Sequence, residues 1–232
     1  MTKKNLNQSF VFFVVGVILL LFSVLLVMHL NKETTDADVF DNNINKVVEI
    51  RVSDDEENWG FGTGFFISDD GHILTNKHMV VNSSSDDYFA FVEARLPTED
   101  DWVSAKIIAI SPTYDLAKIK IEKSNTAFFE ISESVKNGEE IFTIGNPNGF
   151  GLSFAKGNVS CALRNVISNS QTITAMQTSL VINEGNSGGP VFNKQGKLLG
   201  IISFRLKDSS NTVIQGVSFA ILAKHINEFL AK

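Results

Sequence analysis

The sequence predicts an all-β protein of two six-stranded antiparallel β-barrels, with one transmembrane helix before them and a short helix after them. From about Val47 onward the chain consists of short apolar runs rich in β-branched and aromatic residues, separated by turn signals such as "SDDG" and "NPNG". About twelve such runs fall into two groups of about six, which favours two barrels. A single long apolar stretch precedes them.

That apolar stretch, "FVFFVVGVILLLFSVLLVM", runs from Phe10 to Met28. A helix of about 20 such residues spans the hydrocarbon core of a bilayer. Lys3 and Lys4 precede it, which favours a cytoplasmic amino terminus and leaves the rest of the chain outside the cytoplasm. We therefore predict a cytoplasmic tail over 1–9 and a single-pass membrane anchor over 10–30. The alternative is a cleaved signal peptide, but the exit "VMHLNKE" lacks the small residues of a cleavage site.

The rest of the chain is expected to be a linker followed by one folded domain. The polar, acidic segment after the span predicts a tether over 31–45. The domain covers 46–232, with the first barrel over about 46–125 and the second over about 126–232. Near its end, apolar residues recur at helical spacing, which predicts the terminal helix; they are Ile221, Leu222, Ile226, Phe229 and Leu230.

Composition excludes several classes of function. The 232 residues are 44% hydrophobic and 20% charged, with a net charge of −6. No basic stripe is visible, which argues against nucleic acid as a partner. The one cysteine, Cys161, excludes an intramolecular disulfide and a cysteine-rich metal site. We expect no metal and no cofactor, and interpret Cys161 as a small core residue.

One loop concentrates backbone freedom around a single hydroxyl. "NEGNSGGPV", from Asn183 to Val191, places three glycines and a proline around Ser187. The segment is either a plain tight turn or a loop that directs several backbone N–H groups toward one point beside a nucleophile. A serine needs a base to take its proton, so the histidines decide between these readings.

The sequence holds four histidines. His29 lies at the membrane exit and His225 in the terminal helix, where we expect a solvated or dipole-facing role. His72 follows a turn and is expected to be exposed. His78 stands in "ILTNKHMVV", at the end of an apolar strand where rigid neighbours hold a loop side chain. It is the candidate base, with a purely structural role as the alternative.

A carboxylate is the third candidate. In "YDLAKIKI", Asp115 lies between a polar turn and a strand of alternating apolar residues. A half-buried acid at such a junction needs a partner. The alternative is an aspartate that only initiates the turn.

Together these stretches resemble the trypsin-like serine proteases, and most closely the HtrA (high-temperature-requirement, or Deg) branch. "GTGFFISDDGHILTNKHMV" resembles the segment that leads to the family's catalytic histidine, "DLAKIKI" its aspartate segment, and "GNSGGPVFNKQGKLLGI" its nucleophile loop. "TIGNPNG" and "GVSFAI" are weaker matches. The likeness covers roughly residues 45–225, with the order His, Asp, Ser.

The resemblance implies a serine endopeptidase that acts on proteins or peptides outside the cytoplasm, in protein quality control or regulated proteolysis. Ser187 would be the nucleophile, His78 the general base and Asp115 the residue that orients it. The N–H groups of Gly185 and Ser187 would form the oxyanion hole. The alternative function is a catalytically inactive binding or chaperone module with the same fold.

Two departures from the family affect regulation and specificity. The usual "QTD"-like segment here is "QTSLVIN", so the specificity pocket would be formed by Val181, Ile202, Ser203 and Phe204 without a carboxylate. We expect cleavage after small or medium apolar residues. Family members commonly carry PDZ domains, which bind peptide ends by strand addition; the sequence shows none after the terminal helix. Trimers are common in the family, so a homotrimer is a further implication.

Overall fold

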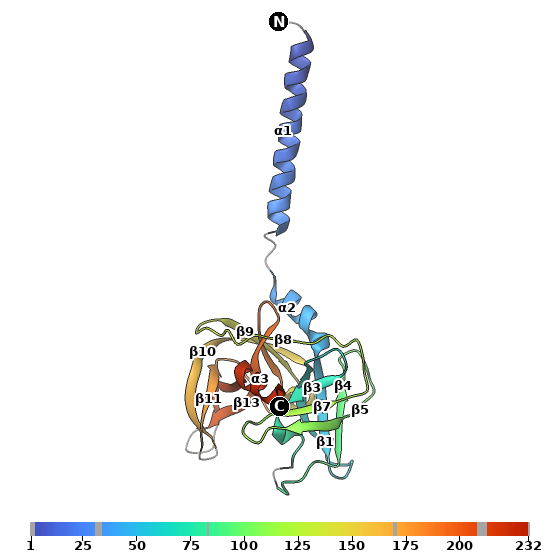
Figure 1. The fold of residues 1–232 in the computed structure, drawn as a ribbon, viewed down its shortest axis with the longest axis vertical. Coiled ribbons are helices and arrows are strands. Elements are labelled where there is room, and N and C mark those ends of the chain that lie inside the picture. The colour runs from blue at the N-terminus through green and yellow to red at the C-terminus, as the bar shows by residue number, and fades with distance from the viewer. Residues whose placement is uncertain (1–2, 31–33, 83, 169–170, 208–212, 232) are drawn as a thin grey trace. The chain divides into compact units, whose positions relative to one another are not determined.

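The computed structural model describes residues 3–30, 34–82, 84–168, 171–207 and 213–231 (Figure 1). The chain divides into two compact units, Met1–Thr35 and Asp36–Lys232. The first unit contains helix α1 (Lys3–Leu30), which includes the long apolar stretch. In α1, the structure describes the side chains of residues 10–24. Among the helical residues described in this way, no helix is both long and apolar enough to cross a membrane.

The segment expected to be a polar tether is helical from Asp36 onward. Helix α2 (Asp36–Asn43) leads into the 3-10 turn η1 (Ile44–Lys46). Val39 is buried, and the Phe40 ring packs edge-on against Phe154 with ring centroids 5.8 Å apart. Two adjacent apolar residues within an acidic stretch are too weak a pattern to predict this helix, yet their burial makes it part of the folded domain.

The first sheet has seven strands in the order β5-β4-β1-β2-β3-β7-β6, and every pairing in it is antiparallel. Its strands are β1 (Val47–Ser53), β2 (Gly60–Phe66), β3 (His72–Thr75), β4 (Phe91–Arg95), β5 (Val103–Ser104), β6 (Lys106–Ile110) and β7 (Ala117–Lys120). The run "WVSAKIIAI", from Trp102 to Ile110, is one of the short apolar runs of the sequence and by its pattern alone would be a single strand. It is divided at Ala105, after which the chain stops pairing with β4 and pairs with β7.

The second sheet also has seven strands, in the order β12-β9-β10-β11-β14-β13-β8. They are β8 (Glu130–Ile131), β9 (Glu140–Gly145), β10 (Ser153–Ser168), β11 (Gln171–Thr178), β12 (Pro190–Asn193), β13 (Lys197–Lys207) and β14 (Val213–Leu222). β12 pairs with both β9 and β13, so the first strand in this order is also hydrogen-bonded to the sixth. The seventh strand, β8, has two residues and pairs parallel to β13.

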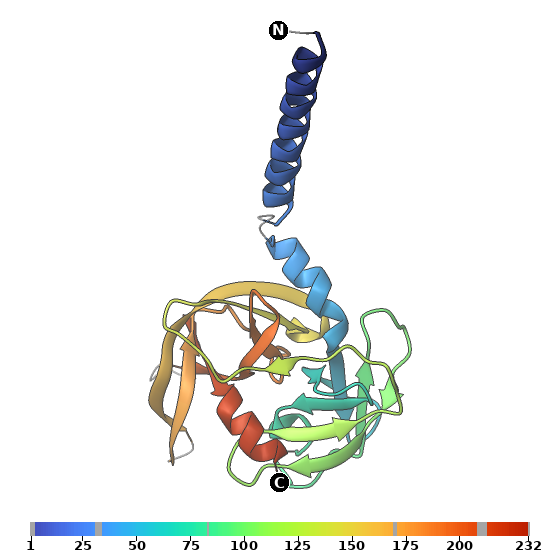
Figure 2. The same cartoon turned by 45° about the horizontal axis from the view of Figure 1, so that its top comes forward.

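Three short helical elements complete the domain. The 3-10 turns η2 (Lys77–Met79) and η3 (Pro147–Gly149) follow β3 and β9, and helix α3 (Ala223–Leu230) follows β14. Figures 1 and 2 show the two sheets side by side, with α3 running along them. The mostly β architecture and the short C-terminal helix are confirmed. Each sheet has seven strands among the described residues, where six were expected.

Of the three apolar clusters among the described residues, one draws on both sheets. It contains Phe65 of β2 and Phe192 of β12, and between them Phe129, whose ring centroid lies 5.7 Å from that of Phe65 and 5.2 Å from that of Phe192. Ile226 and Phe229 of α3 are buried in the same core. Because large side chains from both halves interlock, the loops at the junction of the two sheets have fixed relative positions.

Candidate active site

His78 lies in the turn η2, directly after β3 ends. Its backbone N–H donates to Oδ1 of Asp115 at 3.0 Å, and its ring Nδ1 lies 2.7 Å from Oδ2 of the same carboxylate. The side chain is 38% exposed. Two contacts to one carboxylate fix both the backbone and the ring of His78, while an open face of the ring remains.

Asp115 lies where the chain enters β7, and every oxygen it carries has a partner. Besides His78, the Ser203 hydroxyl donates to Oδ2 at 3.3 Å, and the side-chain amide of Asn76 donates to the Asp115 carbonyl at 2.9 Å. The next residue, Leu116, is fully buried and anchors the turn. The sequence analysis assigned Ser203 to the specificity pocket only; its hydroxyl in fact contacts this carboxylate.

The environment keeps Asp115 ionised. Burial alone would raise the pKa of this carboxyl. The hydrogen bonds and charge of His78, with the hydrogen bond from Ser203, outweigh burial and lower the pKa below its ordinary value. An ionised carboxylate can only accept a hydrogen bond, so Nδ1 of His78 carries a proton, and in the neutral form of the ring Nε2 is left as the acceptor. That is the tautomer a general base needs.

Ser187 lies in the loop 183–189, between β11 and β12, and is partly exposed. Its carbonyl accepts the Thr63 N–H of β2 at 3.0 Å. A Cβ atom at the next residue, Gly188, would lie 3.2 Å from the backbone nitrogen of Asn76, two residues before His78. The structure therefore brings the segments of His78, Asp115 and Ser187 to one place. Among the described residues, the Ser187 hydroxyl donates no hydrogen bond to the His78 ring; such bonds commonly shorten only when substrate binds.

The loop conformation explains its glycines. Gly185 has φ +91° and Gly188 has φ +81°, values that residues with a side chain rarely adopt. A Cβ atom at Gly185 would also collide with the carbonyl oxygen of Asn146. Both positions therefore require glycine for conformation and for space.

The orientations of the Gly185 and Ser187 N–H groups follow from the hydrogen bonds of the carbonyls in the same peptide units. The Glu184 carbonyl accepts the Asn148 N–H at 2.8 Å, and the Asn186 carbonyl accepts the Gly189 N–H at 3.0 Å. In a trans peptide the N–H points opposite to the carbonyl. The N–H groups of Gly185 and Ser187 thus point away from these partners, and neither donates a backbone hydrogen bond within the described part of the chain. Such a pair could stabilise an oxyanion.

The four residues assigned to the specificity pocket have different surroundings. Val181 is 57% exposed, whereas Ile202 is buried and its N–H donates to the Gly189 carbonyl at 2.9 Å. Ser203 contacts Asp115, and the side chain of Phe204 lies outside the described residues. The backbone of Ile202 therefore adjoins the loop of Ser187, while the Val181 side chain faces solvent.

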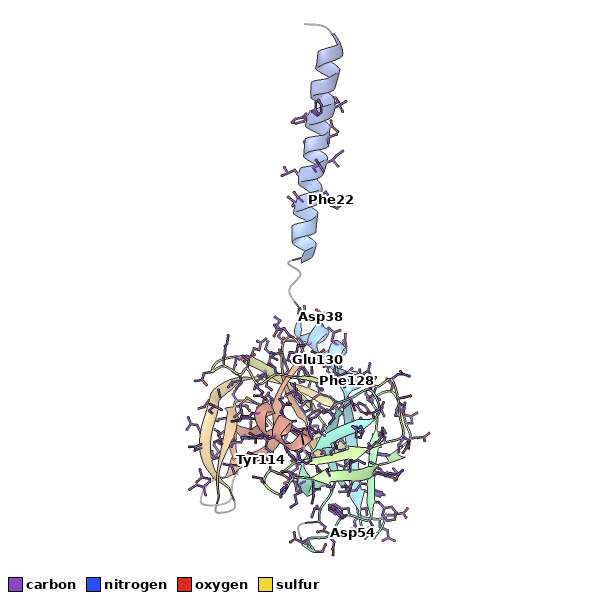
Figure 3. All side chains as sticks on the ribbon, in the orientation of Figure 1. Phe22, Asp38, Asp54, Tyr114, Phe128 and Glu130 are labelled. Carbon is purple, nitrogen blue, oxygen red and sulfur yellow. The ribbon has the colours of Figure 1, made fainter. Side chains whose placement is uncertain are left out.

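His72 and His225 are both less exposed than expected. His225 was expected to be solvated or to face the helix dipole, and its side chain is only 12% exposed. Its ring stacks on Tyr114, with centroids 4.3 Å apart, and both residues contact the Glu228 carboxylate at 3.2 Å. Burial and the bond to Glu228 raise the pKa of Tyr114. Figure 3 shows Tyr114 beside α3, which thus supports the residue preceding Asp115.

The remaining candidates are partly buried or outside the described side chains. His72 contacts Asp70 at 2.8 Å and is a quarter exposed, and the side chain of His29 is outside the described residues. Cys161, expected in the core, is half-buried, and its Sγ contacts the Leu163 carbonyl at 3.4 Å. Within the described ranges, no three His, Cys, Asp or Glu residues cluster as a metal site would require.

The catalytic candidates of this site lie within a known family domain. A model of the "Trypsin-like peptidase domain" matches residues 62–201, a range that includes His78, Asp115 and Ser187. The chain belongs to the trypsin-like peptidase family.

Two relatives by sequence share one description. The chain is 38% identical over 162 residues to a "Probable periplasmic serine endoprotease DegP-like" of Pseudomonas putida (strain GB-1), covering 69% of this chain and 32% of the relative. A protein of the same description from Marinomonas sp. (strain MWYL1) is 37% identical over 165 residues, covering 70% and 33%. The chain spans about a third of the length of the curated relatives it matches.

Two solved structures share the fold. "HtrA-type protease AlgW with tripeptide" has a TM-score of 0.73 and 25% identity, covering 85% of this chain and 62% of that one. The active form of the Rv3671c protease from M. tuberculosis has a TM-score of 0.71 and 20% identity, covering 84% and 83%.

Proposed function

We propose that this chain is an HtrA-type serine endopeptidase that hydrolyses peptide bonds through an acyl-enzyme on Ser187. The observation that carries the proposal is the double contact between His78 and the ionised Asp115 beside the loop of Ser187. In this mechanism Nε2 of His78 takes the Ser187 proton as the hydroxyl attacks the substrate carbonyl. It then delivers that proton to the leaving amine.

The oxyanion that forms on the carbonyl would be stabilised by the N–H groups of Gly185 and Ser187. Each such donor is worth about 3 kcal/mol of transition-state stabilisation. Asp115 would remain ionised throughout and stabilise the imidazolium that forms on His78. In the second half of the reaction, water repeats the attack with the same base. No step needs a metal or a cofactor.

The substrates we propose are unfolded or exposed protein segments, cleaved after small or medium apolar residues. The residues assigned to the pocket, Val181, Ile202, Ser203 and Phe204, offer no carboxylate to pair with Lys or Arg. Cleavage sites mapped by mass spectrometry on unfolded casein test this. A preference for Lys or Arg before the scissile bond would refute the pocket assignment.

We further propose that α1 anchors the protease in a membrane, with the domain outside the cytoplasm. Apart from Ser23, the described side chains of α1 are apolar around the whole helix, and they are exposed, for example Phe12 at 75%. Phe22, labelled in Figure 3, is 65% exposed. The periplasmic description of the relatives supports the same side of the membrane. Resistance to alkaline carbonate extraction is expected, and recovery in the soluble fraction would refute the anchor. Assembly as a homotrimer stays a prediction that sedimentation in detergent can test.

Proteolysis by the full chain in detergent micelles tests the central proposal. We expect the wild type to degrade unfolded casein and leave folded proteins intact, whereas Ser187→Ala and His78→Ala variants are inactive with unchanged circular dichroism. A folded wild type without activity on any unfolded protein would favour the non-catalytic binding module.

A further inference from the structure

Thr63 of β2 is a buried polar residue whose hydrogen-bonding capacity is fully used. Its side chain has no exposed surface. Its N–H donates to the Ser187 carbonyl at 3.0 Å, and its own carbonyl accepts the Thr75 hydroxyl at 2.8 Å. Its hydroxyl donates to the Gly185 carbonyl at 2.7 Å and accepts the Asn146 N–H at 2.9 Å.

These contacts join two parts of the molecule that are far apart in sequence. Thr63 belongs to the first sheet, whereas Gly185 and Ser187 belong to the loop that enters the second sheet. The carbonyls that Thr63 holds are those of the two residues whose N–H groups would bind the oxyanion. One buried residue therefore contacts both donors' residues from the opposite sheet.

The contact to Gly185 matters because glycine has no side chain to restrict its rotation. The Glu184 carbonyl, held by the Asn148 N–H, fixes the peptide before Gly185. The peptide after it is fixed by the Thr63 hydroxyl at its carbonyl and by the Asn183 carbonyl, which accepts the Asn186 N–H at 3.1 Å. Restraints on both sides are needed to hold φ at +91°.

The same hydroxyl also supports the first restraint. By accepting the Asn146 N–H, it fixes the start of the segment Asn146–Gly149, and Asn148 in this segment holds the Glu184 carbonyl. Loss of the hydroxyl would leave the buried Asn146 N–H without its acceptor and the buried Gly185 carbonyl without this donor. Unpaired buried groups of this kind drive local rearrangement.

From these contacts, we propose that the Thr63 hydroxyl is a positioning group for the oxyanion hole, through which the first sheet holds the Gly185 N–H in its productive orientation. The inference rests on the proposed peptidase function and concerns a hydroxyl that contacts Gly185 and Asn146, and none of the three triad side chains. It predicts that a single buried hydroxyl controls the turnover rate without affecting substrate binding.

The test compares Thr63→Val, which keeps the shape and removes the hydroxyl, with Thr63→Ser, which keeps the hydroxyl. In the full chain we expect Thr63→Val to lower kcat about 10- to 100-fold with KM within about threefold, a partial form of the loss seen when an oxyanion donor is removed. Thr63→Ser should retain kcat within about threefold. Inhibition by a peptide boronic acid, which places an oxygen in the oxyanion site, should weaken in parallel with kcat.

A stability control separates positioning from general destabilisation. The Thr126 hydroxyl is also buried and donates to the Ser68 carbonyl at 2.8 Å, in a different part of the domain. Thr126→Val should lower the melting temperature while leaving kcat unchanged. If Thr63→Val does not fold, Thr63→Cys replaces it, because a thiol is only a weak donor. We expect that variant to be at least about tenfold slower than Thr63→Ser.

The outcomes distinguish this inference from the proposed function. An inactive wild type would refute the peptidase itself. An active wild type whose kcat is unchanged in Thr63→Val, or reduced equally in Thr63→Val and Thr63→Ser, would refute the positioning role and leave the peptidase intact.

Discussion

The base and the nucleophile loop are held in place by different kinds of contact. His78 and Asp115 are held by side chains: two bonds between them, one from Ser203 and one from Asn76. The loop 183–189 is held by backbone carbonyls that accept N–H groups from other segments, with the Thr63 hydroxyl as the side-chain donor to Gly185. Substitution of His78 should therefore remove proton transfer and preserve the fold, whereas substitution in the loop should displace the N–H groups that would bind the oxyanion.

The largest effect should come from the reacting groups themselves. Ser187→Ala or His78→Ala is expected to lower kcat/KM by at least about 10⁴-fold, because neither group has a substitute. The double variant should lose little more, since the two act as one unit. Steady-state hydrolysis of a peptide identified from casein cleavage measures this. Losses that multiply in the double variant would argue that the two residues act independently.

Asp115→Asn should be nearly as severe, although it changes one atom. The amide can still accept from the His78 backbone, so the turn should persist. Its NH₂ group cannot accept the ring proton, which leaves His78 in the wrong tautomer. We expect about a 10⁴-fold fall in kcat with an unchanged circular dichroism spectrum. Ser203→Ala, which removes a weaker contact to the same carboxylate, should cost far less. Equal losses in the two variants would contradict this ranking.

Gly185→Ala tests the loop by geometry alone. The new methyl would collide with the Asn146 carbonyl, so the loop must shift and the oxyanion donor moves. A loss of about 10²- to 10³-fold in kcat is expected. Gly138→Ala is the matched control, because Gly138 also has a left-handed backbone, with φ +80°, but nothing lies within 4 Å of its Cβ position. It should cost about 1–2 kcal/mol of stability and leave kcat unchanged. A similar fall in kcat in both variants would contradict the geometric argument.

The smallest effect concerns stability in acid. Because the pKa of Asp115 is lowered in the folded state, its carboxylate stabilises the fold above its ordinary pKa of 3.8, and this contribution is lost as the pH falls below that value. The melting temperature of the wild type should exceed that of Asp115→Asn by a few degrees at pH 6, with the gap closing toward pH 2. A difference in melting temperature that widens in acid would contradict the lowered pKa of Asp115.

The His78–Asp115 pair could largely be predicted from the sequence, because each of the two residues lies next to a recognisable strand or turn. His78 follows an apolar strand and Asp115 precedes one, so their segments could be identified before any contact was known. The partners of Asp115 could not be predicted in the same way. Ser203 lies within β13 of the opposite sheet, and only the three-dimensional packing brings its hydroxyl to the carboxylate.

For the loop 183–189, the sequence indicated the backbone conformation but not the contacts that hold it. Its glycines indicated unusual backbone angles, which Gly185 and Gly188 have. The groups that hold those angles are invisible in the sequence, since Thr63 stands between two glycines in an ordinary strand pattern. The same limit applies to α2, where Val39 and Phe40 are too few to indicate a helix within an acidic stretch, and to the division of one predicted strand at Ala105. In each case a tertiary contact decides the local structure.

Covalent labelling of the full chain in detergent with a fluorophosphonate tests the central claim most directly, because only an activated serine beside a formed oxyanion hole reacts. Mass spectrometry should locate a single adduct on Ser187 in the wild type and none in Ser187→Ala, with labelling of His78→Ala reduced by at least about 10³-fold. A folded wild type that stays unlabelled, or an adduct on another residue, would contradict the account.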